Sequence, residues 1–473
     1  MSKALHLGGK VRALRRAHKV SQARLAEQLG ISASYLNLIE HNRRPLPAAV
    51  LLQLAKMFEL DLATFADDDS DQVKSDLLEI FGDELFDDSG ITKADVDELV
   101  THHPNVTRAV RTLYEAWRAQ TERNRALHEG DLPDLETVGR SVLPSEEVSD
   151  LLQQHQNYFP ELEAAAEALI RDVGLDPHHV QEGLITALGQ LGYRVVFKRS
   201  GDDDKAVRRI LRDDGVIEVS ELLRPRSRHF QLAHAVALLS CSEVLDRIVD
   251  AANFTHDESR HLARVALANY FAGAVLMPYE AFFDAAKEVR YDVELLGHRF
   301  RVSFEQVCHR LTTLRRPGRE GVPFHLIRID VAGNISKRFS ASGIRFARYA
   351  GACPRWNVFR ALLTPGNITT QLSTMPDGEH YFCLSRTLTK GDRGFHALHT
   401  VHAIGLGCRL EHAKELVYAD AFDLSRVDQA VPIGVTCRLC ERTDCEQRAM
   451  PAIGSAVEVN EDLRGVSFYA GVD

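Results

Sequence analysis

The segment from residue 20 to residue 58 constrains the fold most, because its capping and turn residues define two short helices. Ser21 is placed to cap a first helix, Gly30 allows a sharp turn, and Ser32 is placed to cap a second helix. Apolar residues recur at spacings of three and four, and the inward-facing positions are Leu25, Ala26, Leu29, Leu36 and Ile39. The pattern predicts a helix-turn-helix, in which two helices are held at a fixed angle.

The charge of this head segment indicates its partner. Residues 1 to 65 contain ten Lys or Arg and four Asp or Glu, a balance of +6, whereas the whole chain carries −10 and the remainder therefore −16. A basic head on an acidic body favours a localised phosphate-binding surface. Residues 6 to 65 resemble the XRE family of repressor-like helix-turn-helix domains, so we expect binding to double-stranded DNA. The second helix of such a unit enters the major groove, and the expected contacts are Ser32, Ser34, Tyr35 and Asn37 to bases and Gln22, Arg43 and Arg44 to phosphates or flanking bases.

A chain of 473 residues is too long for one hydrophobic core and should divide into about three domains. It has 45% apolar and 26% charged residues, and no run of about 18 uncharged apolar residues predicts a membrane span. The N-terminus lacks the apolar stretch of a secretory signal, so we expect a cytoplasmic protein without membrane contact. We predict a multidomain α+β fold, divided into an all-α head at 1–66, an acidic linker and helical connector at 67–150, a mixed α+β domain at 151–317 and an α+β C-terminal domain at 318–473.

Two phrases of the middle domain resemble a family of zinc peptidases. The helix SRHFQLAHAVALL, residues 227 to 239, is similar to the zinc-binding helix of the IrrE-like, zincin-type family, and NYFAGAVLMP, residues 269 to 278, is similar to its second-helix signature. An active member needs two histidines four residues apart and a Glu base. This chain retains His234, whereas Ala235 stands at the base position, Leu238 at the second histidine and Leu267 at the position of a further acid. One imidazole cannot hold catalytic zinc, so we expect a zincin-like domain whose cleft binds a small molecule.

Six of the eight cysteines lie in the C-terminal domain. Cys437, Cys440 and Cys445 have two and four residues between them, and a loop with this spacing can direct several sulfurs at one centre. A fourth ligand is needed, and Cys353 and Cys408 are both candidates because each lies beside turn-like residues. An iron-sulfur cluster and a structural zinc both fit, and the lack of a second close cysteine pair favours the cluster. The remaining cysteines are interpreted as core residues: Cys241, Cys308 and Cys383.

The tail also contains the phrases ACPRWNVF, MPDGEHYF, LVYADAFDL and CRLCERTDCEQRAMP. In this order after the XRE head and the degenerate peptidase-like domain, they give the whole chain a resemblance to the short-chain fatty-acyl transcription regulators. The resemblance implies control of genes for propionate- or acetate-type acyl-CoA metabolism, an acyl-CoA effector, and in some members an iron-sulfur cluster. We therefore expect a regulator and not an enzyme.

The resemblance also directs the search for an effector site. Coenzyme A carries phosphates and an apolar acyl arm, so its pocket needs Arg or Lys at the mouth and a narrow apolar interior. The candidates flank the expected strands of the middle domain, at Lys198, Arg208 and Arg209, or lie on its two helices, at Arg228, His234 and Tyr270.

Two other classes of function compete with this interpretation. An active peptidase that cleaves a repressor is disfavoured by the lost Glu and His, and a redox enzyme by the absence of a GxGxxG fingerprint after a strand. Because helix-turn-helix proteins commonly bind paired half-sites, we expect a homodimer or a higher homo-oligomer.

Overall fold

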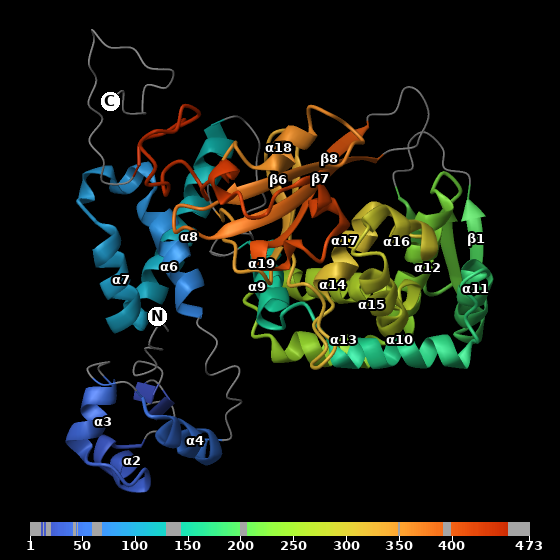
Figure 1. The fold of residues 1–473 in the computed structure, drawn as a ribbon. Helices are drawn as coiled ribbons and strands as arrows, with labels where there is room; N and C mark the ends of the chain where they lie inside the picture. Colours follow the sequence, from blue (N-terminus) through green and yellow to red (C-terminus); the bar gives the residue numbers. More distant parts are fainter. Residues whose placement is uncertain are drawn as a thin grey trace. The chain divides into compact units, whose positions relative to one another are not determined.

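The computed structural model describes residues 11–12, 14–15, 20–40, 44, 46–58, 69–128, 143–198, 206–348, 351–390 and 399–452. The chain forms two compact units, residues 1–121 with 452–456 and residues 122–451 with 457–473 (Figure 1). In the described ranges, none of the helices has the length and hydrophobicity needed to cross a membrane.

The first unit begins with α2 (Gln22–Gln28), α3 (Ala33–Glu40) and α4 (Ala48–Met57). Four of the five predicted inward-facing residues share a core with Val50 and Leu54 of α4, and the fifth, Ile39, is also fully buried. Gly30 has a φ of 66°, a left-handed conformation that glycine adopts at low cost at the end of a helix. The helix-turn-helix therefore forms where the sequence predicts it.

The first unit continues with α6 (Asp69–Phe81), the short 3₁₀ helix η1 (Glu84–Ser89), α7 (Lys93–His102) and α8 (Pro104–His128). A linker was expected at Asp67 to Asp71, but α6 already begins at Asp69. Acidic residues are favourable in the first turn of a helix because of the helix dipole. An acidic run is therefore compatible with a helix start as well as with a linker.

The second unit opens with helices and a small sheet. The helices are α9 (Pro144–Gln154), α10 (Pro160–Asp172), α11 (Val180–Gln190), α12 (Pro225–Ser240), α13 (Ser242–Ala251), α14 (Asp257–Leu276), α15 (Tyr279–Glu288), α16 (Val293–Arg299) and α17 (Phe304–Thr312). The strands β1 (Arg194–Lys198), β2 (Arg208–Leu211) and β3 (Val216–Ser220) lie in the order β1-β3-β2, with β1 parallel and β2 antiparallel to β3. The sequences of β1 and β3 show the apolar alternation that is typical of strands, whereas the short, charged β2 does not.

A larger sheet follows, with strands β4 (His325–Asp330), β5 (Ile335–Ser340), β6 (Thr369–Thr374), β7 (His380–Lys390), β8 (Thr400–Arg409) and β9 (Val431–Pro432). Their order is β5-β4-β8-β7-β6-β9, and all pairs are antiparallel except β6 with β9. The short helices are α18 (Asn357–Ala361), α19 (Leu410–Ala413), η3 (Val417–Ala421) and η4 (Val427–Gln429).

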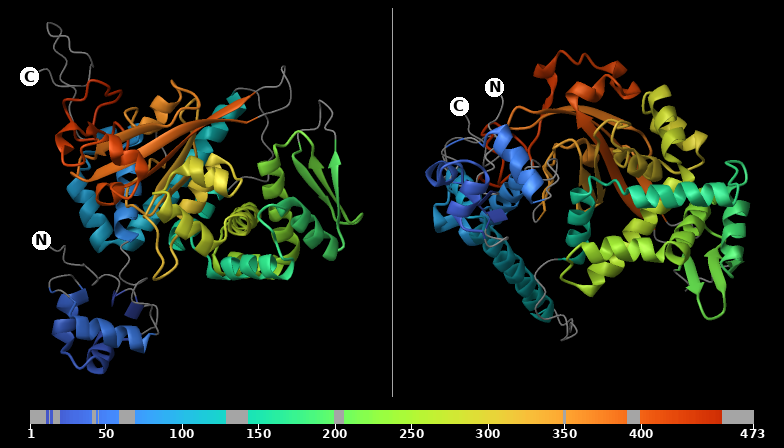
Figure 2. Two further views of the ribbon diagram at one scale, coloured as in Figure 1. Left: turned by 45° about the vertical axis from the view of Figure 1, so that its right-hand side comes forward. Right: turned by 90° about the horizontal axis from the view of Figure 1, so that it is seen from below.

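The two faces of this larger sheet belong to different cores. Leu326, Ile404 and Cys408 pack with residues of α15, α16 and α17, whereas Ile327 and Ala403 pack with the segment around α18. Helices α12 and α14 to α17 lie between the two sheets (Figure 2). The expected division at residue 317 thus falls inside a shared core, because the helices assigned to the middle domain cover one face of the C-terminal sheet.

Candidate functional site

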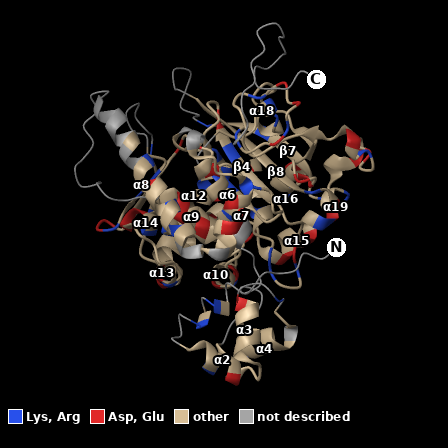
Figure 3. Ribbon diagram, turned by 90° about the vertical axis from the view of Figure 1, so that its left-hand side faces the viewer, with Lys and Arg blue, Asp and Glu red and all other residues tan. Residues whose placement is uncertain are grey.

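The first candidate surface is the start of α3 in the head. Ser32 Oγ accepts a hydrogen bond from the backbone N–H of Tyr35 at 3.1 Å, which caps the helix. The predicted base contacts Ser32, Ser34 and Asn37 are exposed, and Tyr35 is half-buried. Figure 3 shows that α2, α3 and α4 carry few charged residues, and the exposed residues at the start of α3 are polar side chains suited to base edges. Arg44 is exposed, and Arg43 lies outside the described residues.

A buried carboxylate joins the two helices of the head. Glu40, with 1% of its side chain exposed, accepts hydrogen bonds from Arg15 Nε at 2.6 Å and from Gln22 Nε2 at 2.9 Å. Gln22 Nε2 also lies 3.3 Å from Asn37 Oδ1. Gln22, predicted to contact DNA, thus also positions Asn37 on α3.

The second candidate is the degenerate zinc site. His234 lies on α12 and is 4% exposed. Its Nδ1 is 2.8 Å from Arg208 Nη1, and its ring also hydrogen-bonds the backbone of Val265 on α14. Because the guanidinium can only donate, Nδ1 is the acceptor and Nε2 carries the proton. Burial, reinforced by the Arg208 charge, lowers the pKa of His234 to about 4, so the imidazole is neutral.

Arg208 supplies a positive charge at this site. Its Nη1 also donates to the carbonyl of Gln231 at 3.1 Å, and its buried Nε has no hydrogen-bond partner in the described part of the chain. Within the same ranges it forms no ion pair with a carboxylate, and burial lowers its pKa to about 10. The site therefore presents an uncompensated cation beside a neutral imidazole, where a peptidase would hold zinc.

Three other predicted effector residues are not brought together with this pair. Lys198 Nζ lies 3.2 Å and Arg209 Nη1 3.8 Å from the carboxylate of Glu218. The strand register places Lys198, Arg209 and Glu218 on one face of the sheet and Arg208 on the other. Arg228 donates to the carbonyls of Leu223 at 2.8 Å and Glu221 at 2.5 Å, which holds the loop before α12.

Tyr270, the sixth predicted effector residue, belongs to a buried charged network. Its hydroxyl donates to Glu163 Oε1 at 2.6 Å and accepts the backbone N–H of Phe159 at 3.3 Å. Arg310 makes two hydrogen bonds to Glu163, at 2.6 and 3.0 Å, and a third to the carbonyl of Met277 at 2.9 Å. The network joins α10, α14 and α17. Sequence analysis missed Glu163 and Arg310, because 147 residues separate them and neither lies in a motif.

The third candidate is the cysteine-rich loop. Burial raises the pKa of the Cys353 thiol, and the neighbouring Cys437 and Cys440 raise it further. The backbone N–H of Cys353 donates to the carbonyl of Val435 at 2.9 Å, which ties its segment to the loop. In the ranges that the structure describes, no three His, Cys, Asp or Glu side chains are arranged to hold a metal ion.

Cys408, the other predicted fourth ligand, lies in a different place. The glycine-containing segment was expected to be turn-like, but it forms strand β8, and Cys408 is fully buried there. It packs in the core with α15 to α17, whereas Cys353 packs in the core on the other face of the sheet. Successive side chains of a strand point to opposite faces of the sheet, and Cys408 points away from the face on which Cys353 packs. The sheet therefore separates the two thiols.

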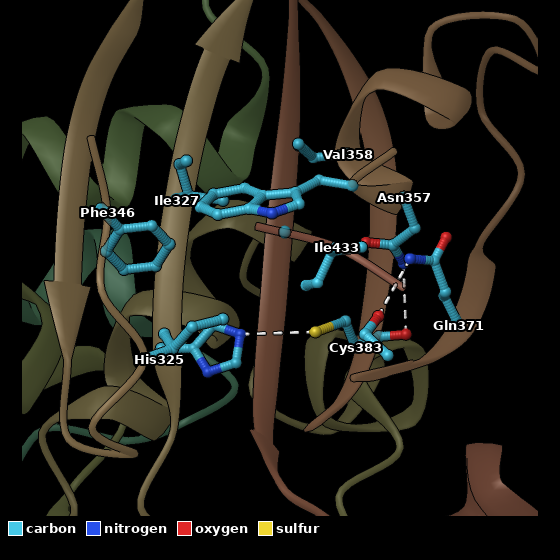
Figure 4. A pocket seen from close by; sticks show the side chains of 12 residues that line it. His325, Ile327, Phe346, Asn357, Val358, Gln371, Cys383 and Ile433 are labelled. Carbon is cyan, nitrogen blue, oxygen red and sulfur yellow. Dashed lines mark hydrogen bonds between the residues drawn. The ribbon is translucent and has the colours of Figure 1, made fainter. Parts of the chain in front are cut away.

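A small cavity lies beside the cysteine loop, between the sheet and α18 (Figure 4). His325 Nε2 and Cys383 Sγ are 3.4 Å apart at one end, and the buried Oε1 of Gln371 has no hydrogen-bond partner among the described residues. Gly407 makes this contact possible, because a Cβ there would lie 2.5 Å from His325 Nε2. The volume of about 20 Å³ holds about one water molecule, so the cavity cannot accept an acyl chain as it stands.

A basic head with an exposed polar second helix, joined to a sensor-like unit, defines a DNA-binding regulator. Family profiles match the three parts in order: "Helix-turn-helix domain" at residues 6–67, "IrrE N-terminal-like domain" at 188–312 and "Short-chain fatty acyl coenzyme A regulator, C-terminal" at 313–469.

Curated relatives match over the full length. The HTH-type transcriptional regulator RamB of Mycobacterium tuberculosis is 40% identical over 99% of both chains, and the propionyl-CoA carboxylase regulator of Cereibacter sphaeroides is 39% identical over 100% of both. A solved structure of a Mycobacterium tuberculosis transcriptional regulator superposes with a TM-score of 0.67 at 41% identity, over 70% of this chain and 100% of that one. The chain belongs to the family of short-chain fatty acyl coenzyme A regulators. It is a DNA-binding transcription regulator and not an enzyme, as the sequence predicted.

Proposed function

We propose that this chain controls genes of short-chain acyl-CoA metabolism, of the propionate or acetate type, in response to an acyl-CoA effector. One relative is named as a regulator of propionyl-CoA carboxylase, which supports the metabolic assignment. The observation that carries the ligand response is the uncompensated Arg208 guanidinium beside His234. Arg208 is half-buried, and a partly desolvated cation without a counter-ion is unfavourable, so an anionic ligand would stabilise this site.

The phosphates of coenzyme A match the chemistry of Arg208. A guanidinium binds phosphate oxygens with two parallel hydrogen bonds, and the unpartnered Nε is available for one of them. The apolar side chains of α12 and α14 around His234 are buried in one core, which suits the acyl arm. In this proposal Lys198 and Arg209 contribute only to the surface charge of the sheet, since both lie near Glu218.

Calorimetric titration of the full chain with propionyl-CoA tests this site. Arg208→Met is expected to weaken binding at least about tenfold, because it removes a charged hydrogen-bond donor. Arg209→Met is the matched control, since Arg209 is the next residue on the same strand and points to the other face. If the two variants bound propionyl-CoA with equal affinity, the proposal that the effector binds at this site would be wrong.

For the head, we propose that α3 reads bases and that Arg44 contacts the phosphate backbone, in a homodimer bound to paired half-sites. Asn37→Ala should change sequence preference by about 1–3 kcal/mol between operators. Arg44→Ala should weaken binding similarly for all sequences and reduce the salt slope by about 1. Binding assays on two operators at several salt concentrations separate these roles; identical effects of both substitutions would contradict the division.

For the tail, we propose that Cys353, Cys437, Cys440 and Cys445 hold an iron-sulfur cluster, with structural zinc as the alternative. Support comes from the proximity of Cys353 to Cys437 and Cys440. The buried Arg448 donates to the backbone carbonyls of Cys437 at 2.9 Å and Cys440 at 2.6 Å, which places a positive charge beside the thiols. A cation favours thiolates and an anionic cluster. When bound, such a cluster supplies one-electron redox chemistry, which would make the regulator responsive to oxidants.

Anaerobic purification with metal, sulfide and absorption analysis tests the cluster. Cys353→Ala should remove most of the iron and sulfide, whereas Cys408→Ala should retain both because Cys408 faces the other core. Cys440→Ser should lose the cluster and the effector response while bare operator affinity suffers less. Stoichiometric zinc without iron or sulfide would replace the cluster with a structural zinc site.

A further inference from the structure

Three cationic side chains converge on one face of the larger sheet. The register aligns Lys337 of β5 with Arg328 of β4, and this face is the one that α17 covers. Lys390, at the end of β7, reaches the same place. Arg328 is the one Lys or Arg of β4. Three strands and a helix therefore contribute to one cluster, which lies on different elements from Arg208.

Glu305, in the first turn of α17, is the only carboxylate paired with these cations in the described ranges. Arg328 Nη1 lies 2.8 Å and Lys337 Nζ 3.7 Å from its Oε1, and Lys390 Nζ lies 2.7 Å from its Oε2. Lys337 Nζ is also 3.3 Å from His309 Nε2, and burial lowers the pKa of His309 to about 3, so this imidazole is a neutral acceptor. Three positive charges thus surround one negative charge.

The cluster is mostly buried at Glu305 and Arg328 and accessible to solvent at the two lysines. Glu305 and Arg328 expose 14% and 16% of their side chains, whereas Lys337 and Lys390 expose 39% and 48%. His402 of β8 lies on the same sheet face, and its buried Nδ1 has no hydrogen-bond partner in the described part of the chain. Asp330 of β4 is paired with His402 in the strand register and its charge acts on that imidazole, but its carboxylate is bound by Asn334 and by the backbone of the β4–β5 turn.

We propose that Arg328, Lys337 and Lys390, with His402, form a binding site for the phosphate group of a small phosphorylated metabolite. A doubly charged phosphate would balance the two positive charges that Glu305 leaves uncompensated. The cations come from three strands of one sheet, so the site is preorganised and little side-chain entropy is lost on binding. If Glu305 were the one anion that these residues bind, they would form a structural ion-pair network. A structural network does not respond to phosphate, whereas a phosphate-binding site does.

Equilibrium dialysis of the full-length chain with radiolabelled inorganic phosphate tests the site. The experiment uses an Arg208→Met background, which removes the other candidate anion site. Lys390→Gln should weaken phosphate binding about tenfold, because a charged hydrogen bond is lost. Lys287→Gln is the matched control: Lys287 is 43% exposed and pairs with Glu415, away from this cluster, so binding should not change. Adenosine 3′,5′-bisphosphate, used as a competitor, distinguishes a nucleotide-bearing ligand from free phosphate by displacing the label at lower concentration than phosphate itself.

Glu305→Gln separates the two roles. In a phosphate site, this substitution raises the net positive charge and should tighten phosphate binding about tenfold, although the melting temperature without phosphate falls. In a purely structural network, the variant is destabilised and phosphate does not restore it. Equal phosphate binding by the background chain, the Lys390→Gln chain and the Lys287→Gln chain would overturn the proposal, and it would do so even if Glu305→Gln failed to fold.

Discussion

Two arginines of the second unit, the buried Arg310 and the half-buried Arg208, show how the same side chain serves two purposes. Arg310 is 2% exposed, and its Nη1 and Nη2 each donate to one carboxylate oxygen of Glu163. The charge of Glu163 outweighs the effect of burial and raises the pKa of Arg310. Among the described residues, Arg208 hydrogen-bonds the neutral His234 and a backbone carbonyl but no carboxylate, and burial lowers its pKa to about 10. The first charge is compensated within the fold, whereas the described residues do not compensate the second.

The difference follows from what each arginine joins. Arg310 connects α17 to α10 and to the carbonyl of Met277, so its bonds hold together helices that lie far apart in the sequence. Arg208 lies on the short strand β2 and replaces the metal of a peptidase-like site with a fixed organic cation. A site that lacks the zinc ligands of a peptidase therefore still carries a positive charge, on which the proposed effector site depends.

The largest expected effect is on the satisfied arginine. Arg310→Met leaves Glu163 buried without its counter-charge and should lower the free energy of unfolding by about 3–5 kcal/mol. The double variant Glu163→Gln with Arg310→Met should recover most of this loss. Chemical denaturation measures both, with Arg299→Met as a surface ion-pair control that should cost far less, because exposed ion pairs contribute little to stability. A loss below 1 kcal/mol in Arg310→Met would mean that the network is not structural.

The second prediction concerns pH at the unsatisfied arginine. The pKa of His234 is lowered from 6.5 to about 4, chiefly by burial and then by Arg208. Between these values the unfolded chain binds a proton that the folded chain does not, so stability is fully present above pH 6.5 and is lost as the pH falls toward 4. The contribution is on the order of 3 kcal/mol. His234→Gln should flatten the pH dependence of denaturant unfolding by about this amount, and an unchanged slope would contradict the burial of a neutral imidazole.

Local patterns and long-range pairings differ in how far the sequence reveals them. The head was predictable because caps, turn and apolar spacing all lie within residues 20 to 58. The loss of the zinc site was equally readable, since the missing ligands lie on one helix. Arg208 was chosen from the sequence only as one of several basic residues, and its contact with His234 spans 26 positions and a strand that the pattern did not predict. The sequence likewise does not distinguish Cys353 from Cys408, because the distinction depends on which face of the sheet each thiol packs against.

The third prediction is that the same substitution, Arg to Met, does not destabilise the chain at Arg208, in contrast to Arg310. Without effector, Arg208→Met should leave the free energy of unfolding unchanged or raise it by about 1 kcal/mol, because an uncompensated, half-buried charge is replaced by an apolar side chain of similar length. The gain is small because the substitution also leaves His234 Nδ1 without its donor. Denaturation in the absence of acyl-CoA, alongside Arg310→Met, gives the comparison directly. If both substitutions destabilised the chain equally, the two arginines would share a structural role.

The smallest expected effect tests whether Arg208 excludes metal. Leu238 lies one helical turn after His234, so Leu238→His restores two histidines on one face of α12. We expect this variant to bind almost no zinc, because Arg208 occupies His234 Nδ1 and its charge repels a dication in a site of low dielectric. Adding Arg208→Ser should raise zinc uptake, measured by elemental analysis after dialysis, at least about tenfold. Zinc bound equally well by the single and double variants would show that the lost ligands alone, and not the arginine, ended metal binding at this site.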